Sequence, residues 1–301
     1  MKNLKLAAVC LSCLTMTGCS ALNFSVEGLI NAPKLTSEQS EIHQALIESV
    51  GSNITLKYPK NGEYRSAYVI ANIDDEPTDE AMVFYEYTSN GSEEDGLRVN
   101  ILDKDEDGKW YSVKELAGAG TDIDQVIISP MGSNNQTDVF VGYQNLTNDE
   151  KTMEIYSYTD GDFKRVALDT YSVLEPLDIN NDGYIELITI QRSTNNDTGA
   201  VTAKASMLNM KNNEITRGEN VDMCDNVTSY VSSKTGMLDS GRRAIFIDGL
   251  TADGKLQTEI IYYRYSGLQN PMQLRSEKLL PLCTRPAGYY SEDLSLIHIS
   301  E

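Results

Sequence analysis

The sequence of 301 residues predicts an all-β fold in which a four-stranded unit occurs four times, preceded by one short helix. The first observation is a repeat, an acidic turn that runs directly into an apolar strand. Its copies are residues 72–83 and 178–189 and, more weakly, 137–143 and 242–248. Equivalent positions in the four copies lie 58, 48 and 57 residues apart, at Glu80, Asp138, Glu186 and Arg243. A period of about fifty residues is typical of the blades of a β-propeller and not of a helical solenoid.

The second observation is the composition of each repeat. Every repeat contains four short segments rich in Val, Ile, Tyr and Thr, which favour strands, and turns of Gly, Asn and Asp separate them. The predicted strands are 67–73, 81–87, 97–103 and 110–114; 124–129, 139–143, 153–158 and 163–168; 172–177, 187–192, 201–209 and 214–217; and 227–232, 244–248, 256–265 and 272–276. We therefore expect four recognisable four-stranded blades within residues 59–283, at about 66–115, 124–168, 172–217 and 227–276.

A helix and a lead-in strand are expected before the blades, in residues 35–58. Thr36 and Gln39 match a capping box, Ile42 and Leu46 lie on one helical face, and Gly51 marks the end. A histidine at position 43 is expected to pack or to face solvent, without a role in a site.

The N-terminal residues 1–18 are identified as an export signal. Lys2 and Lys5 precede an apolar segment that is too short to span a bilayer. Leu14-Thr15-Met16-Thr17-Gly18-Cys19 resembles a bacterial lipobox, which implies a lipid on Cys19 and a tether over residues 19–34. We expect an extracytoplasmic protein anchored to a bacterial membrane at the cell surface, although an ordinary secretory signal cleaved elsewhere is an alternative.

The C-terminal residues 294–301 resemble a translated adapter of transposon-based sequencing libraries. If they are such an adapter, they are not native, and residues 284–293 begin a C-terminal part that this sequence lacks. The propeller would then be truncated. The alternative is a native amphipathic tail.

One acidic turn carries the sharpest chemical signal. Asp178, Asn180 and Asp182 alternate along the chain, so their oxygens can converge on one cation, and Gly183 permits a tight turn. It is not an EF-hand, because Thr189 stands where the EF-hand needs Glu and because the following segment is strand-like. An Asx turn without metal is the alternative.

This turn and the strand after it resemble the FG-GAP repeat of integrin-α-like (VCBS-type) propellers, in which calcium binds a loop between blade strands. The resemblance implies a single calcium site with these ligands: Asp178, Asn180, Asp182, Tyr184 and Glu186. The first repeat offers a weaker second set, in which Pro77 replaces the glycine: Asn72, Asp74, Glu76 and Glu80. The acidic turn at residues 103–108 is expected to be a solvated hairpin.

Charge and motifs limit the function. A net charge of -20 argues against nucleic acid as a partner, and the sequence contains no hydrolase, zinc-protease or phosphate-loop motif. After export, Cys224 and Cys283 are the cysteines left to form a disulfide. We expect a non-catalytic binding or scaffold protein, stabilised by calcium, with a protein or glycan ligand. The alternatives are an extracellular polysaccharide hydrolase or lyase that uses a carboxylate pair on the propeller, and a subunit whose propeller docks a secreted or membrane partner.

Overall fold

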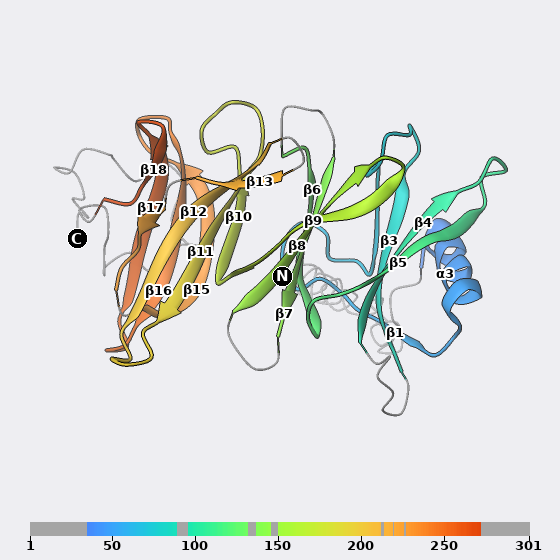
Figure 1. The fold of residues 1–301 in the computed structure, drawn as a ribbon, viewed down its shortest axis with the longest axis horizontal. Helices are drawn as coiled ribbons and strands as arrows, with labels where there is room; N and C mark the ends of the chain where they lie inside the picture. Colours follow the sequence, from blue (N-terminus) through green and yellow to red (C-terminus); the bar gives the residue numbers. More distant parts are fainter. Residues whose placement is uncertain are drawn as a thin grey trace, which may run out of the picture. The chain divides into compact units, whose positions relative to one another are not determined.

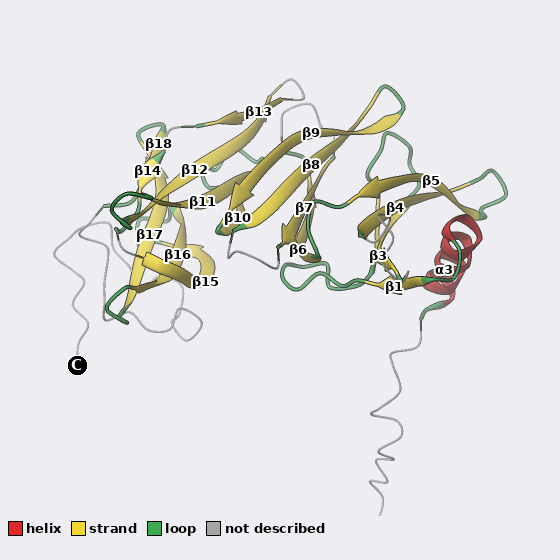
Figure 2. Ribbon diagram, turned by 60° about the horizontal axis from the view of Figure 1, so that its bottom comes forward, coloured by secondary structure: helices red, strands yellow, loops and turns green. Residues whose placement is uncertain are grey.

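A computed structural model describes residues 35–88, 96–131, 137–145, 150–211, 214–218, 220–225 and 227–271. These residues form one helix and four antiparallel sheets (Figures 1 and 2). In the second and fourth sheets the strands pair in chain order, and the first and third sheets each contain a fifth strand outside that order. The predicted class, an all-β fold of propeller type with four blade-like sheets and a short N-terminal helix, is confirmed.

The helix α3 (Ser37–Val50) begins at the predicted capping box. The Gln39 backbone N–H donates to the Thr36 hydroxyl, and the Thr36 N–H donates to the Gln39 side chain, both at 3.1 Å. Gly51 follows the helix with a φ of 86°, which glycine adopts without strain. Ile42 and Leu46 pack with Trp110 of the first sheet, and His43 Nδ1 lies 2.8 Å from the Tyr68 hydroxyl. His43 therefore has the packing role expected of it.

The strands of each sheet are as follows. The first sheet contains β1 (Ile54–Leu56), β2 (Tyr68–Ala71), β3 (Glu80–Tyr87), β4 (Leu97–Lys104) and β5 (Trp110–Ala117). The second contains β6 (Asp122–Ser129), β7 (Asp138–Gln144), β8 (Lys151–Thr159) and β9 (Asp162–Tyr171). The third contains β10 (Val173–Leu177), β11 (Glu186–Thr194), β12 (Val201–Lys211), β13 (Glu214–Arg217) and β14 (Val221–Asp222). The fourth contains β15 (Val227–Met237), β16 (Arg243–Thr251), β17 (Leu256–Arg264) and β18 (Gly267–Gln269).

The first strand of the first sheet is divided. Both β1 and β2 pair with β3, at residues 85–87 and 80–83 respectively. The segment between them leaves its own sheet and bonds to β6, where the Lys60 and Asn61 N–H groups donate to the carbonyls of Ile123 and Asp124 at 3.1 and 2.7 Å. This segment therefore ties the first sheet to the second.

The fourth sheet departs from the sequence prediction in two strands. Its last strand was expected at residues 272–276, which lie outside the described residues, but β18 already pairs with β17 at residues 267–269. The turn between them consists of Tyr265 and Ser266, which both have positive φ although neither is the Gly, Asn or Asp that such hairpin turns favour. Its first strand continues to Met237 instead of ending at residue 232, and its pairing with β16 contains two register shifts, between Val227 and Ser229 and between Tyr230 and Ser232.

Apolar side chains fill the space between successive sheets. Phe84 and Tyr143 share a buried cluster between the first and second sheets, Phe140 and Leu187 one between the second and third, and Ile188 and Ile245 one between the third and fourth. The second strands are continuous buried runs because both of their faces are covered. This pattern explains why those strands are predominantly apolar in the sequence.

The acidic repeat has a structural role. Glu80, Asp138 and Glu186 are the first residues of β3, β7 and β11, and each carboxylate accepts the backbone N–H of the residue seven positions earlier. The donor–acceptor distances are 2.8, 3.2 and 3.1 Å. Glu80 and Glu186 thus close the turns that enter their strands, and Asp138 makes the equivalent bond to Met131. Arg243 begins the equivalent strand of the fourth sheet, where the turn is closed through Leu238 and Arg242 backbone groups.

Candidate functional site

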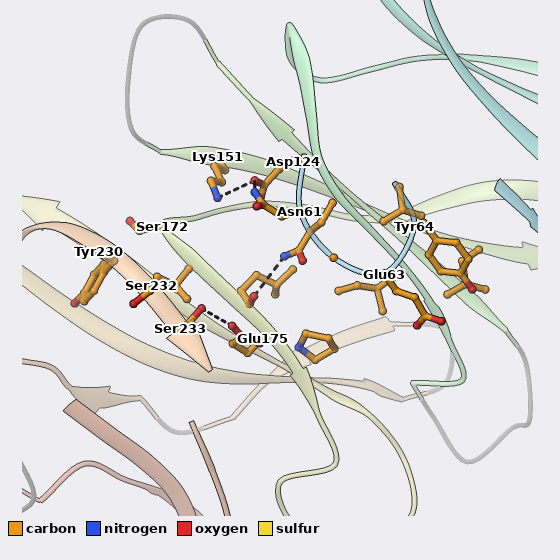
Figure 3. A pocket seen from close by; sticks show the side chains of 18 of the residues that line it. Asn61, Glu63, Tyr64, Asp124, Lys151, Ser172, Glu175, Tyr230, Ser232 and Ser233 are labelled. Carbon is orange, nitrogen blue, oxygen red and sulfur yellow. Dashed lines mark hydrogen bonds and ion pairs between the residues drawn. The ribbon is translucent and has the colours of Figure 1, made fainter. Parts of the chain in front are cut away.

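A cavity of about 570 Å³ opens among the first strands of the second, third and fourth sheets. Strands β6, β10 and β15 form its walls, and the segment at residues 61–64 contributes a further side (Figure 3). Its labelled side chains are mostly polar, with Tyr64 and Tyr230 as aromatic exceptions. The volume suits a small molecule or a short part of a polymer. We call it the inner-strand cavity.

Side-chain hydrogen bonds join the walls of the inner-strand cavity. Asn61 Nδ2 donates to Asp124 at 2.8 Å, and Gln125 Nε2 donates to the Leu174 carbonyl at 3.3 Å. The Ser233 hydroxyl donates to the Glu175 carboxylate. Each bond crosses from one sheet to the next, so these polar residues hold the first strands of neighbouring sheets together.

Asp124 is the most buried acid of this cavity, with 1% of its side chain exposed. Its carboxylate lies 2.8 Å from Lys151 Nζ and accepts the Tyr171 hydroxyl at 2.6 Å, in addition to the bond from Asn61. A buried carboxylate is stable only when such donors compensate for lost hydration. Asp124 is therefore built into the fold.

Glu175 is the second acid in the wall. It is half-buried on β10, and burial raises the pKa of its carboxyl, although the hydrogen bond from Ser233 acts in the opposite direction. A carboxyl group with a raised pKa inside a cavity is chemically suited to donate a proton or to accept a polar ligand.

A smaller cavity of about 360 Å³ adjoins the first and shares Lys151, Ser172 and Tyr230 with it. Arg192 and Gln144 belong to its wall. The two cavities thus border the same side chains and offer one extended polar surface.

The predicted calcium loop connects β10 to β11, and most of its proposed ligands do come together. Asn180 Nδ2 donates to Asp182 at 2.9 Å and to Glu186 at 2.7 Å. The Asp178 carboxylate accepts the N–H groups of Asp182 and Gly183 at 3.0 and 3.2 Å. Tyr184 enters the network through its N–H, which donates to Asp182 at 2.9 Å.

The electrostatics of this loop are mixed. Burial, reinforced by the charges of Asp182 and Asp178, raises the pKa of Glu186 to about 7. Arg243 from the fourth sheet lies 2.7 Å from the Asp178 carboxylate and offsets part of the negative charge. Three carboxylates and one amide oxygen are suitable calcium ligands, but the Asn180 amide nitrogen stands between Asp182 and Glu186. Within the described ranges, no group of three or more His, Cys, Asp or Glu side chains is arranged to hold a metal ion.

The weaker predicted set in the first sheet is less convergent. Asn72 Nδ2 donates to the Thr78 carbonyl at 3.1 Å, and Asp74 accepts the Glu76 N–H at 2.7 Å. Burial raises the pKa of Glu80 to about 7, as in the third sheet. The side chains of Asn72 and Asp74 therefore bond to backbone groups of their own loop, and the weaker calcium set stays a prediction.

The remaining predictions concern the acidic turn at residues 103–108 and the cysteines. Residues 103–108 form the expected hairpin, in which Asp105 accepts the N–H groups of Asp107 and Lys109. The Cys224 thiol lies 3.0 Å from the side-chain oxygen of Gln257, whereas Cys19 and Cys283 lie outside the described residues. No helix of the described part is long and apolar enough to cross a membrane.

The inner-strand cavity was not foreseen from the sequence. Asp124, Glu175 and Ser233 come from three strands about fifty residues apart, and none belongs to a recognisable motif. The available signal was the occurrence of polar residues among apolar ones in the first strands, such as Asp124 and Gln125 between Ile123 and Val126. That signal identifies inward-facing polar groups only once the strands are assembled.

Comparison with known proteins gives little. No protein-family model matches the chain, and no curated protein matches it. Two similar solved structures are candidate 6-phosphogluconolactonases of Bacteroides uniformis and Bacteroides fragilis, at 14% and 10% identity and TM-scores of 0.35 and 0.33. The matches cover 73% and 74% of this chain and 66% and 68% of those structures, so the chain spans about two thirds of their length. Such low scores carry no argument about function, and the class of the protein, an all-β fold with four blade-like sheets, is defined by its own strands.

Proposed function

We propose that this chain is a non-catalytic binding protein that works outside the cell, anchored to a bacterial membrane by a lipid on Cys19. Its ligand is a glycan or a segment of another protein, held in the inner-strand cavity. Calcium in the loop of residues 178–186 adds stability to the scaffold and takes no part in chemistry.

The burial and hydrogen bonding of Asp124 are the main support for this proposal. An acid that acts in hydrolysis must be free to exchange a proton with the substrate or with water. Asp124 instead accepts bonds from Lys151, Tyr171 and Asn61 and lies almost wholly out of solvent. Glu63, the third acid in the lining, is exposed on the segment at residues 61–64. The cavity therefore presents polar hydrogen-bonding groups in fixed positions, with its most buried acid held by three donors, which suits binding better than acid–base catalysis.

Binding is tested with the chain from residue 20 onward and an array of neutral and acidic oligosaccharides. A bulky variant, Ser172→Trp, should abolish binding of any sugar that occupies the cavity, because Ser172 lines both adjoining cavities. Ser193→Trp is the matched control, since Ser193 is an exposed residue of β11. Equal binding by both variants, with melting temperatures like that of the parent, would place the ligand elsewhere.

The anchor is tested separately in cells. Expression in a bacterium fed with labelled palmitate should label the parent chain and leave Cys19→Ser unlabelled. The parent should sediment with membranes and Cys19→Ser should be released. An unlabelled parent chain would contradict the anchor without affecting the proposed ligand site.

The raised pKa of Glu175 favours one alternative, an extracellular polysaccharide hydrolase. In that case the chain would release reducing ends from a polysaccharide panel, and Glu175→Gln would reduce the rate by orders of magnitude. We expect no release by either protein. Hydrolysis that depends on Glu175 would refute the non-catalytic proposal.

A further inference from the structure

A third cavity, of about 600 Å³, lies at the turns of the third and fourth sheets. Three arginines line it, Arg242, Arg243 and Arg264, together with the aromatic ring of Tyr265. None of the residues that line it is Asp or Glu, although the chain holds 45 acidic and only 25 basic residues. We call it the arginine cavity.

The topology explains why these residues meet. In an antiparallel meander, the turn between the first and second strands and the turn between the third and fourth strands lie at the same end of the sheet. Arg242 and Arg243 stand at the β15–β16 turn, and Arg264 and Tyr265 at the β17–β18 turn. The β10–β11 loop of the neighbouring sheet supplies Asn180 and Asn181.

Arg243 is held in place by the chain itself. Its Nη1 lies 2.7 Å from both the carboxylate and the backbone carbonyl of Asp178. The side chain nevertheless remains 39% exposed, and a guanidinium has five N–H donors in a rigid fork. Arg243 can therefore keep its bonds to Asp178 and still contribute positive potential to the cavity.

Tyr265 has an unusual conformation and exposure. It forms a two-residue turn with Ser266, with φ values of 53° and 64°, in a region where Asn and Gly are favoured and a bulky residue is strained. Its side chain is 80% exposed, and the Arg264 guanidinium lies 4.5 Å from the ring centroid. Neither turn formation nor burial explains a tyrosine here, so the strain points to a function of the exposed ring.

We propose that the arginine cavity binds a sugar that bears a carboxylate. The guanidinium groups would pair with the carboxylate in the bidentate geometry that arginine favours, and the C–H face of the sugar ring would stack on Tyr265. A phosphate or sulfate ion would pair with the arginines but would make no stacking contact with the exposed ring of Tyr265. Long polyanions are disfavoured because the net charge of -20 repels them, so the fitting ligand is a short saccharide with a single acidic sugar.

The first test is titration calorimetry of the chain from residue 20 onward with two probes, glucuronic acid and N-acetylneuraminic acid, against neutral glucose. The acidic sugars should bind at least about tenfold more tightly than glucose, and the stronger of the two identifies the type of acid. Inorganic phosphate should compete weakly. Equal affinity for acidic and neutral sugars, or full displacement by equimolar phosphate, would overturn the proposal.

The variants separate binding from folding. Tyr265→Asn introduces a residue that suits the turn, so the melting temperature should stay the same or rise while binding of the acidic sugar falls at least about tenfold. Arg264→Gln should lose binding to a similar extent. The matched control is Tyr58→Asn, at another exposed tyrosine that does not line the cavity. Unchanged affinity in Tyr265→Asn and Arg264→Gln would contradict the site.

This site is independent of the inner-strand cavity. Ser172→Trp should keep its affinity for acidic sugars, because Ser172 does not line the arginine cavity. If Ser172→Trp abolished that binding while Arg264→Gln retained it, the acidic sugar would belong to the inner-strand cavity and the present proposal would fail.

Discussion

The carboxylate of Asp124 on β6 and the ammonium of Lys151 on β8 form an ion pair at 2.8 Å, in which 1% of the Asp124 side chain and 25% of the Lys151 side chain are exposed. Lys151 also lies 5.6 Å from the centre of the Tyr171 ring, whose hydroxyl donates to Asp124. The same carboxylate receives Asn61 from the segment that leaves the first sheet. One buried charge thus links that segment with three strands of the second sheet.

Removal of this carboxylate should be costly. Asp124→Ala leaves Lys151 without its buried partner and Asn61 and Tyr171 without their acceptor, and we expect a loss of about 3–5 kcal/mol in the free energy of unfolding. Asp124→Asn should cost less, because the amide oxygen can still accept a hydrogen bond. Urea denaturation followed by circular dichroism measures both. The control is Asp253→Ala, in an exposed pair with Lys255, which should leave the unfolding midpoint unchanged. An equal loss of stability in Asp253→Ala would show that the Asp124 network contributes no more to stability than an exposed ion pair.

Stability should increase as the pH falls from about 8 to about 5.5. The pKa values of Glu80 and Glu186 are raised from 4.5 to about 7, mainly by burial. Folding therefore takes up protons between pH 4.5 and pH 7. The stability from both groups is fully present below pH 4.5 and is lost as the pH rises through about 7. Their exposed turns screen part of the effect, so we expect a gain of about 1 kcal/mol from each.

The isosteric variants Glu80→Gln and Glu186→Gln test this origin. Each glutamine stays neutral and can still accept the N–H bond that closes its turn, so each variant should be more stable than the parent at about pH 8 and less dependent on pH. Below about pH 4 the trend is expected to reverse in all of them, because the pKa of Asp122 is lowered by its bonds to Lys60 and Lys57. A parent chain whose stability rises steadily from pH 5.5 to 8 would contradict the assignment.

Calcium should raise the melting temperature, and more at pH 8 than at pH 5.5. Metal and proton compete for Glu186, so protonation weakens the site. At a calcium concentration one hundred times the dissociation constant the gain is about 2.7 kcal/mol, or about 5–10 °C for a domain of this size. Calorimetry in excess chelator and in millimolar calcium measures it.

The control for calcium lies in another acidic turn. Asp182→Asn should abolish the calcium-dependent shift, whereas Asp105→Asn, in the solvated hairpin of the first sheet, should leave it intact. An identical melting temperature with and without calcium would contradict the calcium site. It would mean that the Asn180 amide, which donates to both Asp182 and Glu186, is sufficient to hold these side chains together.

The sequence was informative where the signal is local. The acidic turns and apolar second strands recur with Glu80, Asp138, Glu186 and Arg243 at one structural position, because each turn and its strand are encoded by about a dozen contiguous residues. The inner-strand cavity is not local, since its groups come from separate repeats. The β17–β18 turn was not predicted for another reason. Tyr265 and Ser266 adopt positive φ there, and the sequence lacks the Gly or Asn from which such a turn is usually predicted.

The packing of β7 against β9 leads to the last prediction. Gly142 lies where an added Cβ would collide with the hydroxyl of Tyr171 and contact its Cζ at 3.2 Å. Tyr171 is fully buried and fixed by its bond to Asp124, so it cannot move aside. Gly142→Ala should therefore destabilise the chain by about 1–3 kcal/mol or more through overpacking.

A double-mutant cycle identifies the cause. Tyr171→Phe removes the colliding oxygen, so the penalty of Gly142→Ala should be smaller by at least about 0.5 kcal/mol in that background than in the parent. Tyr171→Phe alone should cost about 1–3 kcal/mol, because Asp124 loses a donor. Additive penalties in urea denaturation would show that the alanine acts through the nearby Phe140 ring, 3.2 Å from the added Cβ, and not through the tyrosine hydroxyl.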